Sequence, residues 1–124
     1  MSRRPPEQFL DRFGSLARAV RLAAAQAYSR FDVGSTQARF LRYLQQHPGS
    51  SQAELARATV TDPTLTGRVL ESIKERGWVR RERSESDRRQ YVLELTAAGR
   101  RVCARVDAAR TEIAERMALA LDER

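Results

Sequence analysis

Residues 84–96, SESDRRQYVLELT, constrain the fold of this chain more than any other segment. The first half is polar and ends in two adjacent arginines, Arg88 and Arg89, and the second half alternates apolar residues with others. Alternation with a period of two is typical of a half-buried strand. With residues 78–81 as the first strand and 90–95 as the second, the pattern predicts an antiparallel hairpin with arginines at its tip.

Two short helices are predicted immediately before the hairpin. Ser51 and Glu54 form a capping-box pattern at the start of one, and Asp62 followed by proline marks the start of the other. Gly77 is placed to end the second helix in the left-handed conformation. Two helices joined by a tight turn indicate a helix-turn-helix. Its second helix should bury Leu65, Val69, Leu70 and Ile73 and expose Thr64, Gly67, Arg68 and Ser72.

Longer amphipathic helices are expected on both sides of this unit. Apolar residues recur at three- and four-residue steps over residues 6–30, and again from Val102 through Ile113 to Leu121. A further helix should follow, capped by Ser35 or Thr36. We therefore divide the chain into residues 1–35, 36–96 and 97–124. The outer stripes must be buried against each other or a second copy, and we favour a homodimer.

Composition limits the possible functions more loosely. The chain has 124 residues and a net charge of +7, which favours a polyanionic partner. Lys74 is the only lysine, however, and such a strong preference for arginine indicates that genome base composition accounts for many of the basic residues. Nothing approaches the length of a membrane span, and no signal-peptide core follows the N-terminus. We therefore expect a cytoplasmic protein with no membrane partner.

A helix-turn-helix followed by a basic hairpin suits double-stranded DNA, with the helix in one groove and the hairpin tip in the next. Arg68 can pair with guanine, and Arg88 and Arg89 can enter a narrow minor groove. Arg83 is the expected phosphate contact on the first strand, joined by Ser51 and Gln52 from the preceding helix. The alternatives are solvated arginines in an arginine-rich protein and a serine that only caps its helix.

Enzyme chemistry has little support in the sequence. There is no phosphate-binding glycine loop, nucleophile elbow or metal-ligand spacing, so we expect no catalytic residue, metal or cofactor. His47 by itself forms neither a metal site nor a catalytic pair. Cys103 lies on an apolar helical stripe, which favours a buried residue over a redox switch.

Three stretches together resemble the MarR/SlyA family of winged helix-turn-helix transcription regulators: AELARATV, RVLESIKERGWVRR and DRRQYVLELTAAG. The last is similar to the family's wing signature, which falls here on Asp87, Arg89, Leu95, Thr96 and Gly99. The resemblance implies that Arg89 enters the minor groove and that Asp87 orients the wing. It also implies that Thr64, Gly67, Arg68 and Ser72 face the major groove.

Two features depart from the family pattern. Gly67 stands where a hydrogen-bonding residue is commoner, which shifts the expected base contact to Arg68. The chain also ends sooner than family members usually do, so we expect a smaller or differently built dimer. The family often binds small phenolic or lipophilic ligands between its dimerisation helices and DNA-binding lobe, and nothing in the sequence identifies such a ligand.

The sequence therefore predicts a mainly α fold with a small β-ribbon: a winged helix-turn-helix flanked by N- and C-terminal dimerisation helices. The expected function is a transcriptional repressor that binds a pseudo-palindromic DNA operator, with a possible response to a ligand. The alternative is a winged-helix adaptor that binds a protein partner without DNA readout. DNA binding would weaken steeply with salt, whereas apolar helix docking would not.

Overall fold

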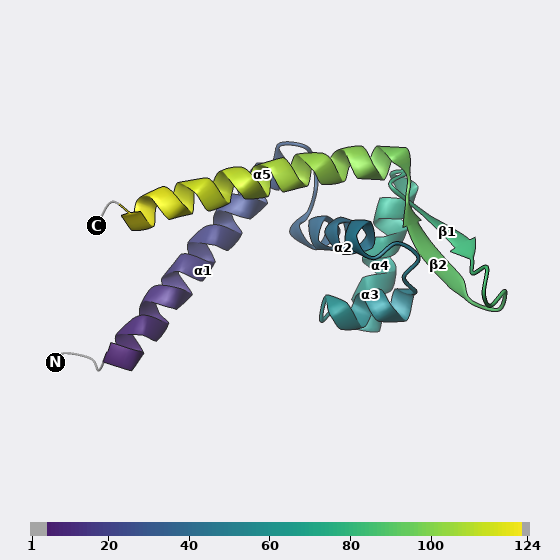
Figure 1. Cartoon of the computed structure of the whole chain (residues 1–124), viewed down its shortest axis with the longest axis horizontal. Coiled ribbons are helices and arrows are strands. Elements are labelled where there is room, and N and C mark those ends of the chain that lie inside the picture. Colours follow the sequence, from purple (N-terminus) through teal and green to yellow (C-terminus); the bar gives the residue numbers. More distant parts are fainter. Residues whose placement is uncertain (1–4, 123–124) are drawn as a thin grey trace.

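The computed structural model describes residues 5–122, with side chains to residue 119 (Figure 1). In that range the elements are α1 (Pro5–Ser29), α2 (Ser35–Gln46), α3 (Gln52–Ala58), α4 (Pro63–Glu75), β1 (Val79–Arg83), β2 (Tyr91–Leu95) and α5 (Ala97–Asp122). The prediction of a mainly helical chain with one small ribbon is confirmed. Figure 1 shows α2, α3, α4 and the hairpin on one side of α5, while α1 and α5 diverge toward the chain ends.

The core is centred on α2. Its side chains Phe40, Leu41 and Leu44 are almost completely buried, and α2 contacts α1, α3, α4, α5 and β2. Burial of an apolar side chain of this size contributes about 1.5–3 kcal/mol, so this short helix supplies much of the driving force. Ile73 from α4 and Val106 from α5 complete the same cluster. The helix-turn-helix is thereby fixed to the start of α5.

The helix boundaries of the helix-turn-helix follow from local capping. The Ser51 hydroxyl accepts a hydrogen bond from the Glu54 backbone N–H at 3.1 Å, and Asp62 Oδ1 accepts from Leu65 N–H at 3.0 Å. Gly77, which follows α4, has φ of +77°, a conformation in which glycine avoids the strain of a Cβ atom. These three boundaries are confirmed as predicted.

Three details differ from the prediction. Helix α2 is capped by Gly34, not by Ser35 or Thr36, because the Gly34 N–H donates to the Gln37 side-chain oxygen at 2.9 Å. Leu65 is 41% exposed instead of inward-facing. The position beside it, Thr66, is fully buried, and its hydroxyl donates to the Asp62 carbonyl at 2.8 Å.

The hairpin pairs β1 with β2 in antiparallel register, from Val79 opposite Leu95 to Arg83 opposite Tyr91. Its base is joined to the start of α5. The Trp78 carbonyl accepts from Thr96 N–H at 3.0 Å, and a Cβ atom added at Gly99 would lie 2.0 Å from the same carbonyl oxygen. Only a residue without a side chain allows α5 to approach β1 this closely.

The outer helices are buried along only part of their length. In α1, Tyr28 is 4% exposed and packs on the core, whereas Phe9 and Phe13 near the other end are 65% and 60% exposed. In α5, Ile113 is 7% exposed and Leu119 is 62% exposed. The side chain of Leu121, which the sequence placed on the same stripe, lies outside the described residues. An apolar surface therefore extends along the diverging ends of α1 and α5.

Candidate nucleic-acid interface

The outer face of α4 is open to solvent. Thr64, Arg68, Glu71 and Glu75 recur at helical spacing on this face, and all four are exposed. The Arg68 guanidinium makes no hydrogen bond or ion pair with any residue that the structure describes. All of its N–H donors are therefore available for a ligand at this face.

Ser72 lies at the edge of this face, toward α2. Its hydroxyl donates to the Val69 carbonyl at 2.6 Å and accepts from the Gln37 side-chain nitrogen at 3.0 Å. The side chain is half-buried. Of the residues predicted to face the major groove, Thr64 and Arg68 lie near the centre of the exposed face and Gly67 near its α3 side, while Ser72 already has two partners inside the protein.

The start of α3 lies beside α4. The Ser51 hydroxyl, besides capping α3, donates to the Glu54 carboxylate at 3.2 Å, so the predicted phosphate contact would compete with an existing bond. The Gln52 amide makes no hydrogen bond with the described residues. Its nitrogen lies 3.6 Å from the point where a Cβ atom of Gly67 would be. Gln52 and Gly67 therefore adjoin across the two helices.

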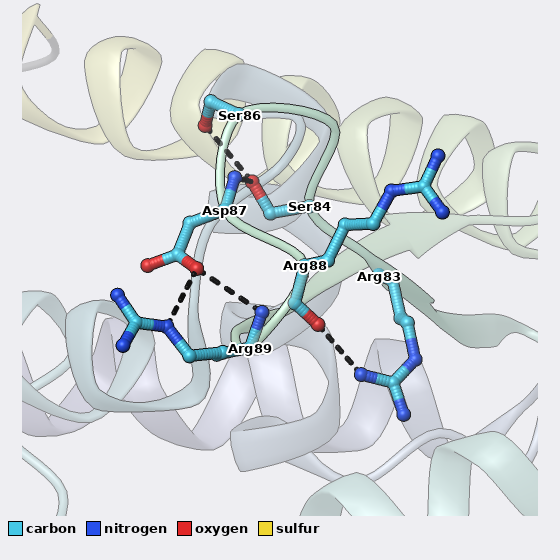
Figure 2. A network of polar contacts seen from close by, with 6 residues as sticks. All are labelled: Arg83, Ser84, Ser86, Asp87, Arg88 and Arg89. Carbon is cyan, nitrogen blue, oxygen red and sulfur yellow. Dashed lines mark hydrogen bonds and ion pairs between the residues drawn. The ribbon is translucent and has the colours of Figure 1, made fainter.

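The hairpin tip, residues 84–90, is organised by Asp87 (Figure 2). Its Oδ1 accepts from the Arg89 backbone N–H at 3.1 Å and lies 3.4 Å from Arg89 Nε, while the Asp87 N–H donates to the Ser84 hydroxyl at 3.3 Å. The Gln90 N–H closes the turn onto the Asp87 carbonyl at 3.0 Å. This geometry fits the orienting role that the resemblance implied for Asp87, and it leaves the Arg89 side chain 92% exposed.

The other arginines near the hairpin tip differ in the contacts that they make within the protein. Arg83 donates to the Arg88 carbonyl at 2.6 Å, and its guanidinium lies 4.9 Å from the Tyr91 ring centre, which Arg81 also approaches at 5.5 Å. In Figure 2 the Arg88 side chain extends away from Arg89. Arg83, predicted as a phosphate contact, thus also stabilises the backbone of the hairpin tip through its bond to the Arg88 carbonyl.

Tyr91 was not recognised from the sequence as a site residue. It is 45% exposed and carries arginines against its ring, a cation–π arrangement. Tyr91 and Arg83 are cross-strand partners, so the hairpin register alone would have predicted this contact. A register cannot be assigned from one sequence when the loop length is uncertain.

The hairpin and the α3–α4 pair extend from the same side of α5 (Figure 1). The outer face of α4 is not covered by any described element. Both surfaces are open to solvent, so each can contact a ligand. Arg68, Arg88 and Arg89 supply positive charge to these surfaces, against Glu71 and Glu75 on α4.

Residues 5–122 contain no cluster of three potential metal ligands, and no helix among them is long and apolar enough to cross a membrane. Cys103 is fully buried in the core. Burial, with a smaller effect of the Asp107 carboxylate, raises the pKa of its thiol to about 11, so the thiol is protonated at neutral pH.

Residues 31–90, the segment from the α1–α2 turn to the end of the hairpin tip, match the model of the MarR family. Over this segment the chain is similar to the MarR family. It is 38% identical over 60 residues to the HTH-type transcriptional regulator BilQ of Clostridium symbiosum, covering 48% of this chain and 42% of that protein. It is 41% identical over 68 residues to the HTH-type transcriptional repressor Rv2887 of Mycobacterium tuberculosis, covering 55% and 49%.

The likeness in structure extends further along the chain. A MarR transcriptional regulator from Methanosarcina mazei superposes with a TM-score of 0.76 and 26% identity, over 90% of this chain and 80% of that one. The winged helix-turn-helix fold is therefore shared with MarR proteins. The matches with the two curated relatives span less than half of the length of either protein.

Proposed function

We propose that this protein is a MarR-family regulator that binds duplex DNA and represses transcription. The observation that carries the proposal is that two exposed, arginine-bearing elements extend from the same side of α5 (Figure 1): α4, where Arg68 has no partner among the described residues, and the hairpin, whose tip Asp87 holds in shape. Thr64 and Arg68 would meet base edges in the major groove, and Arg89 the minor groove. The names of the relatives support a regulator over a protein-binding adaptor.

The active form in this proposal is a homodimer. Phe9, Phe13, Leu10 and Leu119 expose apolar side chains on the diverging ends of α1 and α5, and the Phe9 and Phe13 rings stack at 6.3 Å. A surface of this kind on a monomer marks an interaction site. A second copy with the same surface would bury it and place one α4 helix at each half of a two-fold site.

A ligand response is the third part of the proposal. A cavity of about 360 Å³ lies between α1, α2 and α5, where the resemblance places the family's ligand site. Tyr28 and Ala24 contribute apolar surface, and arginines on all three helices (Arg21, Arg39, Arg42 and Arg110) surround it. This lining favours a small anionic ligand with an apolar body.

Selection of bound duplexes from a random pool, followed by sequencing, tests the function. The expected result is a pseudo-palindrome whose half-sites are about one helical turn, roughly 34 Å, apart. Binding should also weaken steeply with salt, since phosphate contacts release counterions. Absence of any enriched sequence, together with salt-independent binding to a protein partner, would favour the adaptor function instead.

A further inference from the structure

The exposed face of α4 has a gap at Gly67. The neighbouring positions on the face carry Thr64, Arg68 and Glu71, all exposed, whereas Gly67 has no side chain with which to contact a base. Glycine also costs a helix about 1 kcal/mol relative to alanine. The structural reason for a glycine at this position should therefore lie in the residues that surround it.

The surroundings consist of one side chain from another helix. Gln52, the first residue of α3, places its amide nitrogen 3.6 Å from the position of a Gly67 Cβ atom, and no other heavy atom outside the local chain lies within 4 Å of that position. Any branched side chain at position 67 would therefore compete with the Gln52 amide for this space. A Cβ atom alone would only touch the amide at ordinary van der Waals distance, so it is a side chain longer than that of alanine that would displace Gln52.

The Gln52 amide is also chemically free. It is half-buried at the end of an open groove of about 810 Å³ between α3 and the start of α4, whose walls include Ala53, Ala56 and Pro63. It makes no hydrogen bond with the described residues. One carbonyl and one NH₂ group side by side match the N6–H donor and N7 acceptor of adenine in the major groove.

We propose that Gln52 supplies from α3 the base contact that Gly67 leaves vacant on α4, and that it selects adenine at one position in each half-site. The proposal rests on the function proposed above. A phosphate contact by Gln52, which the sequence suggested, would be independent of sequence. The position of the amide against the exposed face of α4 favours contact with a base edge instead.

The test uses the full chain and measures relative affinities for duplexes that differ at each position of the selected site. Gln52→Ala removes the amide. Gly67→Val keeps Gln52 but fills its space, and valine is a better helix former than glycine, so this variant retains the helix. Gln46→Ala is the matched control, since Gln46 is exposed at the end of α2.

The wild-type protein and Gln46→Ala should prefer adenine at one position per half-site by roughly 5- to 140-fold, the range of a bidentate base contact. Gln52→Ala and Gly67→Val should each reduce that preference to about 2-fold or less, with unchanged affinity for scrambled DNA. The double variant should lose nothing more, because both changes remove the same contact.

Equal weakening on selected and scrambled DNA by Gln52→Ala would assign the amide to a phosphate and overturn the proposal. An unchanged adenine preference in both single variants would overturn it as well. In either case duplex binding persists, so the proposed function stands. Failure of the wild-type chain to bind any duplex would remove the function itself and this inference with it.

Discussion

Gly99→Ala provides a direct test of how α5 is joined to the hairpin. An added Cβ atom would lie 2.0 Å from the Trp78 carbonyl oxygen, 2.9 Å from its carbon and 3.2 Å from its Cα. These are backbone atoms of the residue just before β1, and they cannot rotate away as the end of a side chain can. The start of α5 and the base of the hairpin would have to separate by about 1 Å to reach a tolerable contact.

The expected cost follows from three contributions. Overpacking of this kind costs about 1–3 kcal/mol and occasionally more. Separation would also stretch the hydrogen bond from Thr96 N–H to the Trp78 carbonyl, worth about 1 kcal/mol. Alanine in place of glycine inside α5 returns up to about 1 kcal/mol of helix propensity. We expect a net loss of roughly 1–4 kcal/mol in the free energy of unfolding.

Gly14→Ala is the matched control, because Gly14 is also inside a helix but has no heavy atom within 4 Å of its added Cβ. It should stabilise the protein by up to about 1 kcal/mol. Urea unfolding followed by circular dichroism, at one protein concentration for all variants, measures both changes. A Gly99→Ala protein as stable as the wild type would refute the close approach of α5 and β1.

Four further outcomes are expected. Arg89→Ala should weaken binding to selected and scrambled duplexes alike in titrations at several salt concentrations. Arg68→Ala should instead relax the preference at one base pair per half-site, by about 1–3 kcal/mol. If Arg68→Ala weakened binding to both duplexes equally, Arg68 would not be a base contact. Iodoacetamide should barely modify Cys103 in the folded protein at pH 8, since a pKa of about 11 leaves roughly one thiol in a thousand ionised, and rapid alkylation would contradict its burial. Phe13→Glu should shift the protein to monomer in analytical ultracentrifugation, because it places a charge in the apolar surface, and an unchanged dimer would move the interface elsewhere.

The features that were predicted from sequence are those determined by neighbouring residues. Ser51 and Asp62 cap their helices through a hydrogen bond three residues along the chain, so the pattern itself contains the interaction. Gly77 ends α4 for a similarly local reason. The hairpin was recognisable because alternation over residues 91–95 and a polar tip occur within one short segment.

The features that were missed depend on contacts between distant segments. Thr66 is buried rather than Leu65 because the direction of α4 is set by its packing on α2, α3 and β1, and helical spacing alone cannot give that direction to within one residue. The proximity of Gln52 and Gly67 likewise depends on how α3 crosses α4. Sequence alone showed Gly67 only as a departure from a family pattern, without the neighbour that accounts for it.

We expect the hairpin tip to contribute mainly to affinity and α4 mainly to sequence selectivity. The two elements differ in how much conformational freedom they lose when DNA binds. Asp87 and Arg83 already fix the backbone around Arg89, so contact at the tip requires little further ordering of the chain. Arg68 has no partner among the described residues, and holding its side chain in one rotamer costs up to about 2 kcal/mol. A correct base contact returns about 1–3 kcal/mol. On a wrong base that gain is absent, so we expect Arg68 to favour the correct sequence and Arg89 to contribute to binding on any sequence.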